Sequence, residues 1–84
     1  MSAWQLPTFR GYTVDLRLGQ FRKVEPGKGL ECIDFASRRG ASLLARWGRE
    51  EPDQVAATVE HYRALGVPLK IEWLILAGMV DERL

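Results

Sequence analysis

The sequence predicts an α+β fold in which a bent β-hairpin over residues 11–35 packs against two or three helices. Two observations lead to this class. Apolar residues alternate with polar ones from Tyr12 to Leu18, which is the period of a strand with one buried face. After Ser37 the apolar spacing changes to that of amphipathic helices. The 84-residue chain is long enough for one modest core, so residues 1–84 are expected to form a single domain.

The predicted hairpin has one irregular strand and one regular strand. Gly19 interrupts the first strand, and a glycine within a strand pattern often marks a bulge. We therefore expect this strand to bend at Gly19 and continue through Val24. Residues 26–29, Pro-Gly-Lys-Gly, supply a turn before the second strand, Leu30–Phe35. Residues 1–8 show no periodicity and are expected to be flexible.

Three helices are predicted over about residues 38–47, 52–65 and 68–80. Ser37 is a suitable N-cap for the first helix, because its hydroxyl can accept a hydrogen bond from a first-turn amide, and Gly48 is suited to end it. A proline opens the second helix at its favoured first position. In the third segment the apolar residues fit a helix better, but they also alternate as in a strand, and that alternative stays open.

Charge is divided unevenly along a chain whose formal net charge is only +1. Residues 10–49 carry nine basic and four acidic side chains, a net charge of +5, whereas residues 50–84 carry three basic and seven acidic ones, a net charge of −4. This asymmetry indicates either an anionic partner for the basic half or attraction between the two halves, within one chain or between two chains.

Basic residues interleaved with aromatic ones in the hairpin, together with the first helix, form a candidate contact surface for a partner protein or for single-stranded nucleic acid. The alternative is that the aromatic side chains face inward and the cations are solvated. The candidate contact residues are Arg17, Phe21, Arg22, Lys23, Lys28, Arg38 and Arg39.

Self-association is expected because the apolar surface exceeds what a two-stranded hairpin can cover, and the hairpin has open edges. The candidate residues are Trp47, Trp73 and Leu76. We therefore expect a protein partner, with a homo-oligomer as the first candidate.

Residues able to carry enzyme chemistry are few. The single cysteine, Cys32, lies mid-strand and is expected to be buried and structural, and the single histidine, His61, is expected on a solvated helix face. One cysteine and one histidine make a zinc site from this chain alone very improbable. Asp15 and Asp34 could face each other across the hairpin, but such residues usually pair with neighbouring cations. We predict no catalytic, cofactor or metal site, and no enzyme.

Three segments resemble a group of small, uncharacterised bacterial proteins. They are Tyr-Thr-Val-Asp-Leu-Arg at residues 12–17, Phe-Arg-Lys-Val at 21–24 and Leu-Glu-Cys-Ile-Asp-Phe at 30–35. The resemblance covers roughly residues 11–47 and implies a bacterial or phage origin. It implies no known activity, so no site residue can be transferred from it.

These observations predict a non-enzymatic protein-interaction or regulatory module in the bacterial cytoplasm. The alternative is a nucleic-acid-binding module that uses the basic hairpin and the first helix. The single cysteine fits a reducing compartment. The longest apolar stretch, Trp73–Val80, is too short to span a bilayer, so no membrane partner is expected.

Overall fold

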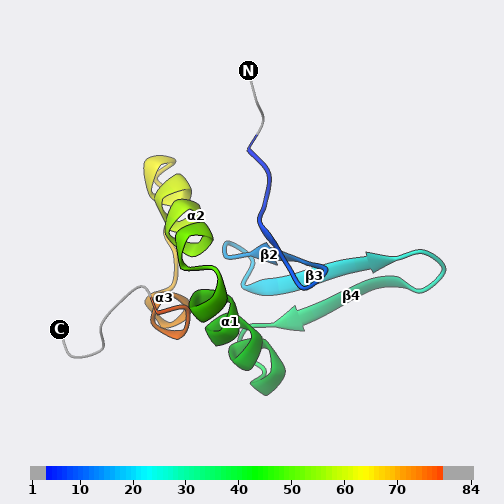
Figure 1. The fold of residues 1–84 in the computed structure, drawn as a ribbon. Helices are drawn as coiled ribbons and strands as arrows, with labels where there is room; N and C mark the ends of the chain where they lie inside the picture. The colour runs from blue at the N-terminus through cyan, green and yellow to red at the C-terminus, as the bar shows by residue number, and fades with distance from the viewer. Residues whose placement is uncertain (1–3, 79–84) are drawn as a thin grey trace.

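A computed structural model of the chain describes residues 4–78 and confirms the α+β class. One antiparallel sheet has the strand order β1-β2-β3-β4, and the helices lie on the opposite side of the molecule from the tip of the β3–β4 hairpin (Figure 1). The elements are β1 (Thr8–Phe9), β2 (Tyr12–Asp15), β3 (Gln20–Glu25), β4 (Gly29–Asp34), α1 (Arg38–Glu50), α2 (Pro52–Ala64) and α3 (Ile71–Leu76).

The chain reverses between β2 and β3, so the predicted continuation of one strand through Gly19 is wrong. β2 and β3 are antiparallel neighbours, with Val14 opposite Phe21. The Asp15 carboxylate accepts hydrogen bonds from the backbone amides of Arg17 and Leu18, at 3.1 and 2.9 Å. These two bonds close a tight turn. Gly19 completes this turn at φ 74°, a conformation that glycine adopts without steric cost.

The turn predicted at residues 26–29 joins β3 to β4, with the Lys28 amide donating to the Glu25 carbonyl at 3.0 Å. The register places Phe21 opposite Ile33, and both side chains are buried. Val24 and Leu30 form a cross-strand pair on the other face of the sheet, where they are 76% and 61% exposed.

The helices cover only one face of the sheet. Val14, Phe21 and Ile33 from that face join buried residues of α1 and α2 in one hydrophobic core. The opposite face carries Cys32, whose side chain is exposed, so the predicted burial of this cysteine is wrong. The reason is that no helix covers the face of β4 on which Cys32 lies.

α1 begins as predicted, because the Ser37 hydroxyl accepts a hydrogen bond from the Gly40 amide at 3.0 Å. It does not end at Gly48 but continues through Glu50. Gly48 lies against the backbone of Ala77, where a Cβ atom would collide with the Ala77 carbonyl. This glycine therefore permits close packing of the C-terminal segment on α1 and does not stop the helix.

The other two helices follow the predicted pattern. Pro52 occupies the first turn of α2, and Val55, Val59 and Tyr62 form its buried stripe. The third segment is helical over Ile71–Leu76, which is shorter than the predicted 68–80; residues 79 and 80 lie outside the described part of the chain.

From Trp4 onward, the N-terminal segment for which the sequence predicts flexibility lies against the rest of the chain. Trp4 stacks on His61 with ring centroids 3.8 Å apart, and the Pro7 carbonyl accepts a hydrogen bond from the Val14 amide at 2.8 Å. Residues 1–3 of that prediction lie outside the described residues. Tertiary contacts thus position a segment that has no periodicity of its own.

Candidate functional site: a basic face on α1

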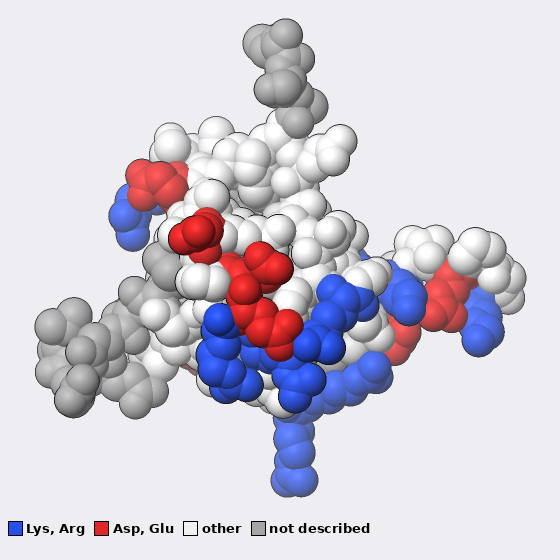
Figure 2. Space-filling model, viewed as in Figure 1, with Lys and Arg blue, Asp and Glu red and all other residues white. Residues whose placement is uncertain are grey.

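Helix α1 carries arginines on its exposed side because its apolar residues face the core. Leu44 and Trp47 are fully buried, which turns the positions between them toward solvent. Four arginines of this helix are exposed: Arg38, Arg39, Arg46 and Arg49. We call them the α1 basic face. Basic side chains gather over α1 in the space-filling view (Figure 2).

Most of the α1 basic face is not neutralised within the described chain. Among residues 4–78, Arg38, Arg46 and Arg49 have no acidic side chain within ion-pair distance, whereas Arg39 lies 3.4 Å from Glu31. Three unpaired guanidinium groups on one helix create a local positive potential that an anionic group can neutralise.

A cavity of about 330 Å³ lies beside this face. Arg10, from the turn between β1 and β2, approaches α1 there, and its Nη2 donates to both carboxylate oxygens of Glu50 at 2.9 and 2.7 Å. Among the described residues, 4–78, none of those that line the cavity is acidic. We call it the arginine pocket, and its lining is Arg10, Tyr12, Arg39, Ser42, Leu43 and Arg46.

Two of the three pocket arginines are held in place by neighbours. The Arg10 guanidinium lies 5.2 Å from the centroid of the Phe9 ring. Arg39 donates to the Tyr12 hydroxyl at 3.1 Å, and that hydroxyl donates to Glu31 at 3.2 Å. Aromatic contact and a short hydrogen-bonded chain therefore orient these side chains without placing a carboxylate in the pocket wall.

The predicted hairpin contacts are less suited to binding than the helix. Phe21 is fully buried and presents no surface. Arg22 donates to Asp15 at 2.8 Å, and Lys23 and Lys28 both pair with Glu25 at 3.2 and 3.8 Å. Arg17 is exposed in the β2–β3 turn, and Arg38 and Arg39 belong to the α1 basic face.

The candidate contacts predicted from the sequence do not include Arg46 or Arg49. The spacing of Arg39, Arg46 and Arg49 at i, i+7 and i+10 places them on one helix face, away from the apolar side. Nothing local in the sequence places Arg10 beside that face, because it approaches α1 only through the β1–β2 turn, where its backbone has φ 51°.

The predicted self-association residues are mostly part of the core. Trp47 is fully buried and its Nε1 donates to the Gln54 side chain at 2.6 Å, so it cannot contact a second chain. Trp73 is half-buried and packs edge-to-face on Phe35, with ring centroids 5.4 Å apart; Leu76 is also half-buried. The three predicted residues are thus buried or half-buried within one chain, whereas other large apolar side chains, Val24 and Leu30 among them, stay exposed.

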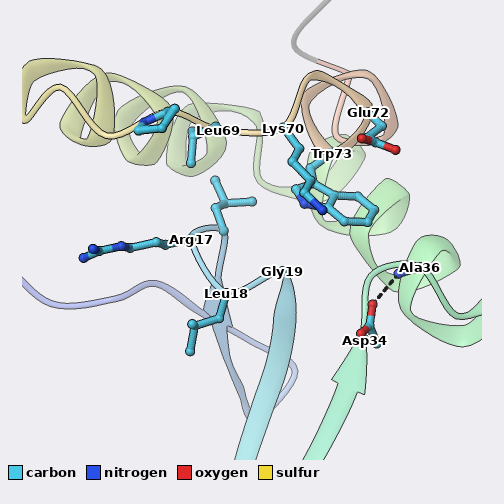
Figure 3. Close-up of a pocket in the computed structure, with 11 residues that line it drawn as sticks. Arg17, Leu18, Gly19, Asp34, Ala36, Leu69, Lys70, Glu72 and Trp73 are labelled. Carbon is cyan, nitrogen blue, oxygen red and sulfur yellow. Dashed lines mark hydrogen bonds between the residues drawn. The ribbon is translucent and has the colours of Figure 1, made fainter.

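A larger cavity, about 660 Å³, lies between the β2–β3 turn and the start of α3 (Figure 3). The Lys70 ammonium lies 5.7 Å from the Trp73 ring centroid, and the Asp34 carboxylate accepts from the Ala36 amide at 2.8 Å. Arg17 extends away from Trp73 in this view. Cations and carboxylates both line this cavity, so it offers no single-sign site.

The two aspartates considered in the sequence do not face each other across the hairpin. Asp15 and Asp34 are not cross-strand partners, since each lies opposite Gln20 on a different side of β3. Burial, followed by the Asp15 charge, raises the pKa of the Tyr62 hydroxyl, which the charges of Arg17 and Arg22 lower in part. Within residues 4–78, no group of three His, Cys, Asp or Glu side chains could hold a metal ion.

Comparison of the chain with protein-family models, with curated proteins and with solved structures finds no match. Over residues 4–78, no helix has the length and apolar character needed to cross a membrane.

Proposed function

We propose that this protein is a non-enzymatic interaction module of the cytoplasm of a bacterium, or of a phage, and that it binds an acidic segment of a partner protein. The observation that carries this proposal is the α1 basic face. Within the described chain, Arg38, Arg46 and Arg49 lack ion-pair partners on this one exposed surface.

Arginine suits this role better than lysine would. Its planar guanidinium donates two parallel hydrogen bonds to one carboxylate, and it is more weakly hydrated than an ammonium group. Charges at such a surface mainly accelerate association and select partners, and their effect weakens as salt screens them. An acidic partner segment would therefore bind with an affinity that falls as ionic strength rises.

Nucleic acid is the alternative ligand for the same surface. The density of arginines on α1 favours it, because phosphates are bound by Arg and Lys side chains. One feature favours protein instead. Phe21 and Tyr12 are buried, so these hairpin aromatics do not offer the exposed platform on which the bases of single strands stack.

The test reverses the charge of two arginines on α1 in the double variant Arg46→Glu, Arg49→Glu. The control is Arg63→Glu on α2, where Arg63 pairs with Glu60 at 3.3 Å. Fluorescence anisotropy measures binding of an oligoglutamate-containing peptide and of mixed-sequence single-stranded DNA across a salt series. We expect the peptide to bind wild type and the control, and to lose at least about tenfold in affinity with the double variant.

Equal peptide affinity in the wild type and the double variant would refute the basic face as the binding surface. Tighter binding of DNA than of the peptide at physiological salt, lost in the double variant, would make nucleic acid the ligand. Arg22 and Lys23 are unsuitable for charge reversal, because both already pair with carboxylates within the sheet.

Association with a second copy is proposed to use the tip of the β3–β4 hairpin, since Trp47 is buried and Trp73 is half-buried. Val24 and Leu30 are exposed there as a cross-strand apolar pair. Sedimentation at high micromolar concentration should give a mass above that of one chain, and Val24→Lys with Leu30→Lys should reduce it. A single-chain mass for the wild type would refute this proposal.

A further inference from the structure

We infer that the arginine pocket is a binding site for a phosphate monoester, carried by a phosphorylated side chain of the partner protein. This inference rests on the proposed function and specifies the group that the partner presents. Its basis is that three guanidinium groups, from two elements far apart in the sequence, line one cavity of about 330 Å³ together with the Ser42 hydroxyl.

The pocket retains hydrogen-bond donors that the chain does not use. Arg10 donates to Glu50 through Nη2 alone, so its Nη1 and Nε have no hydrogen-bond partner among residues 4–78. Arg46 makes no side-chain hydrogen bond or ion pair within the same residues. Each guanidinium carries five N–H donors, so several remain for a ligand.

The number and charge of these donors fit a phosphate better than a carboxylate. One carboxylate has two oxygens and a single negative charge, which one arginine fork can match. A phosphate monoester has three terminal oxygens and a charge between about −1.5 and −2 at neutral pH. Three arginines around one cavity can each reach a different oxygen, whereas a carboxylate would leave donors unused.

The neighbouring carboxylates orient two of the pocket arginines but do not line the cavity. Glu50 and Glu31 hold Arg10 and Arg39, yet neither glutamate lines the cavity. Two of the three arginines thus have neighbours that favour their present orientation before binding, which lowers the entropy lost when the ligand arrives. Leu43 adds an apolar wall against which the methylene of a phosphoserine can pack.

The test compares three fluorescent peptides with the same acidic flanks, carrying serine, phosphoserine or glutamate at the central position. Anisotropy at physiological salt measures their affinities for the wild type, for Arg46→Gln and for the control Arg63→Gln. We expect the phosphoserine peptide to bind at least about tenfold more tightly than the serine peptide, with glutamate between them or equal to serine. Arg46→Gln should abolish this advantage, and inorganic phosphate should compete.

The outcomes separate this inference from the proposed function. Equal affinity for the three peptides, weakened in the Arg46→Glu, Arg49→Glu double variant, would keep the acidic-segment function and overturn the phosphate pocket. An advantage for phosphoserine that persists in Arg46→Gln would also overturn it. Absence of binding to all three peptides would refute both proposals. Tighter binding of a 5′-phosphorylated oligonucleotide than of the phosphopeptide, dependent on Arg46, would assign the pocket to nucleic acid and overturn the peptide assignment.

Discussion

Replacement of Gly40 by alanine tests the joint between the sheet and α1. Gly40 lies in the first turn of the helix, where a Cβ atom would be less than 3.0 Å from both the carbonyl oxygen and the carbonyl carbon of Asp34, so the backbone must shift. The same Asp34 carbonyl accepts hydrogen bonds from the Ser37 amide at 3.0 Å and from the Ser37 hydroxyl at 2.6 Å. The methyl group therefore forces β4 away from the helix and disturbs the cap as well.

The expected loss of stability follows from three contributions. Overpacking against backbone costs about 1–3 kcal/mol, and a disturbed N-cap costs about 1 kcal/mol. Alanine returns roughly 1 kcal/mol through its higher helix propensity. The net destabilisation from Gly40→Ala is thus about 1–3 kcal/mol, which corresponds to a decrease of about 5–20 °C in Tm for a domain of this size.

Urea denaturation and calorimetry measure this change, with Ser42→Ala on the exposed side of the same helix as the matched control. That control should change the free energy of unfolding by no more than about 0.5 kcal/mol. An increase in the stability of Gly40→Ala, as helix propensity alone requires, would refute the close approach of α1 to β4.

Three further predictions concern buried or exposed single side chains. Gln54→Ala should destabilise the protein by about 1–3 kcal/mol in urea denaturation, because it leaves the buried Trp47 Nε1 without a hydrogen-bond acceptor. If this is the cause, Gln54→Ala should cost no further stability in a Trp47→Phe background. Equal costs in both backgrounds would contradict it. Because the pKa of Tyr62 is raised, above pH 10 the unfolded state releases a proton that the folded state retains, so stability should fall as pH rises. Between about pH 9 and 11, Tm should therefore fall less steeply for Tyr62→Phe than for the wild type. Identical slopes of Tm against pH would be inconsistent with the raised pKa. Cys32 should react rapidly with a thiol reagent in the folded protein, and Cys32→Ser should cost less than about 0.5 kcal/mol; labelling only after denaturation would disprove its exposure.

Local signals in the sequence predicted local structure well. The Ser37 cap and the proline at the start of α2 act through their own backbone neighbours, so the residues themselves specify the outcome. Gly48 gave the wrong helix end, because a glycine that permits close packing has the same sequence signature as one that stops a helix. Gly19 similarly marks a tight turn, and the predicted bulge at this position is wrong.

Burial was harder to predict than the division of residues between faces. The alternation of residues along β4 places Ile33 and Cys32 on opposite faces of the sheet. It could not reveal that the described helices cover only one of these faces. Trp47 was a candidate for self-association but is buried, because α1 packs its side chain against the other helices. The arginine pocket was missed for a related reason, since Arg10 meets Arg46 only in the folded chain.

The structure also bears on the uneven charge of the two halves. If the halves attracted each other within one chain, ion pairs would join them, yet among residues 4–78 Arg10 with Glu50 is the one pair that does so. Three hairpin cations, Arg22, Lys23 and Lys28, pair with carboxylates of their own half, and among residues 4–78 the cations of α1 without an ion pair are Arg38, Arg46 and Arg49. Ion pairs between the two halves therefore neutralise little of the positive surplus in the described residues. The proposed anionic group of a partner would relieve the mutual repulsion among these arginines.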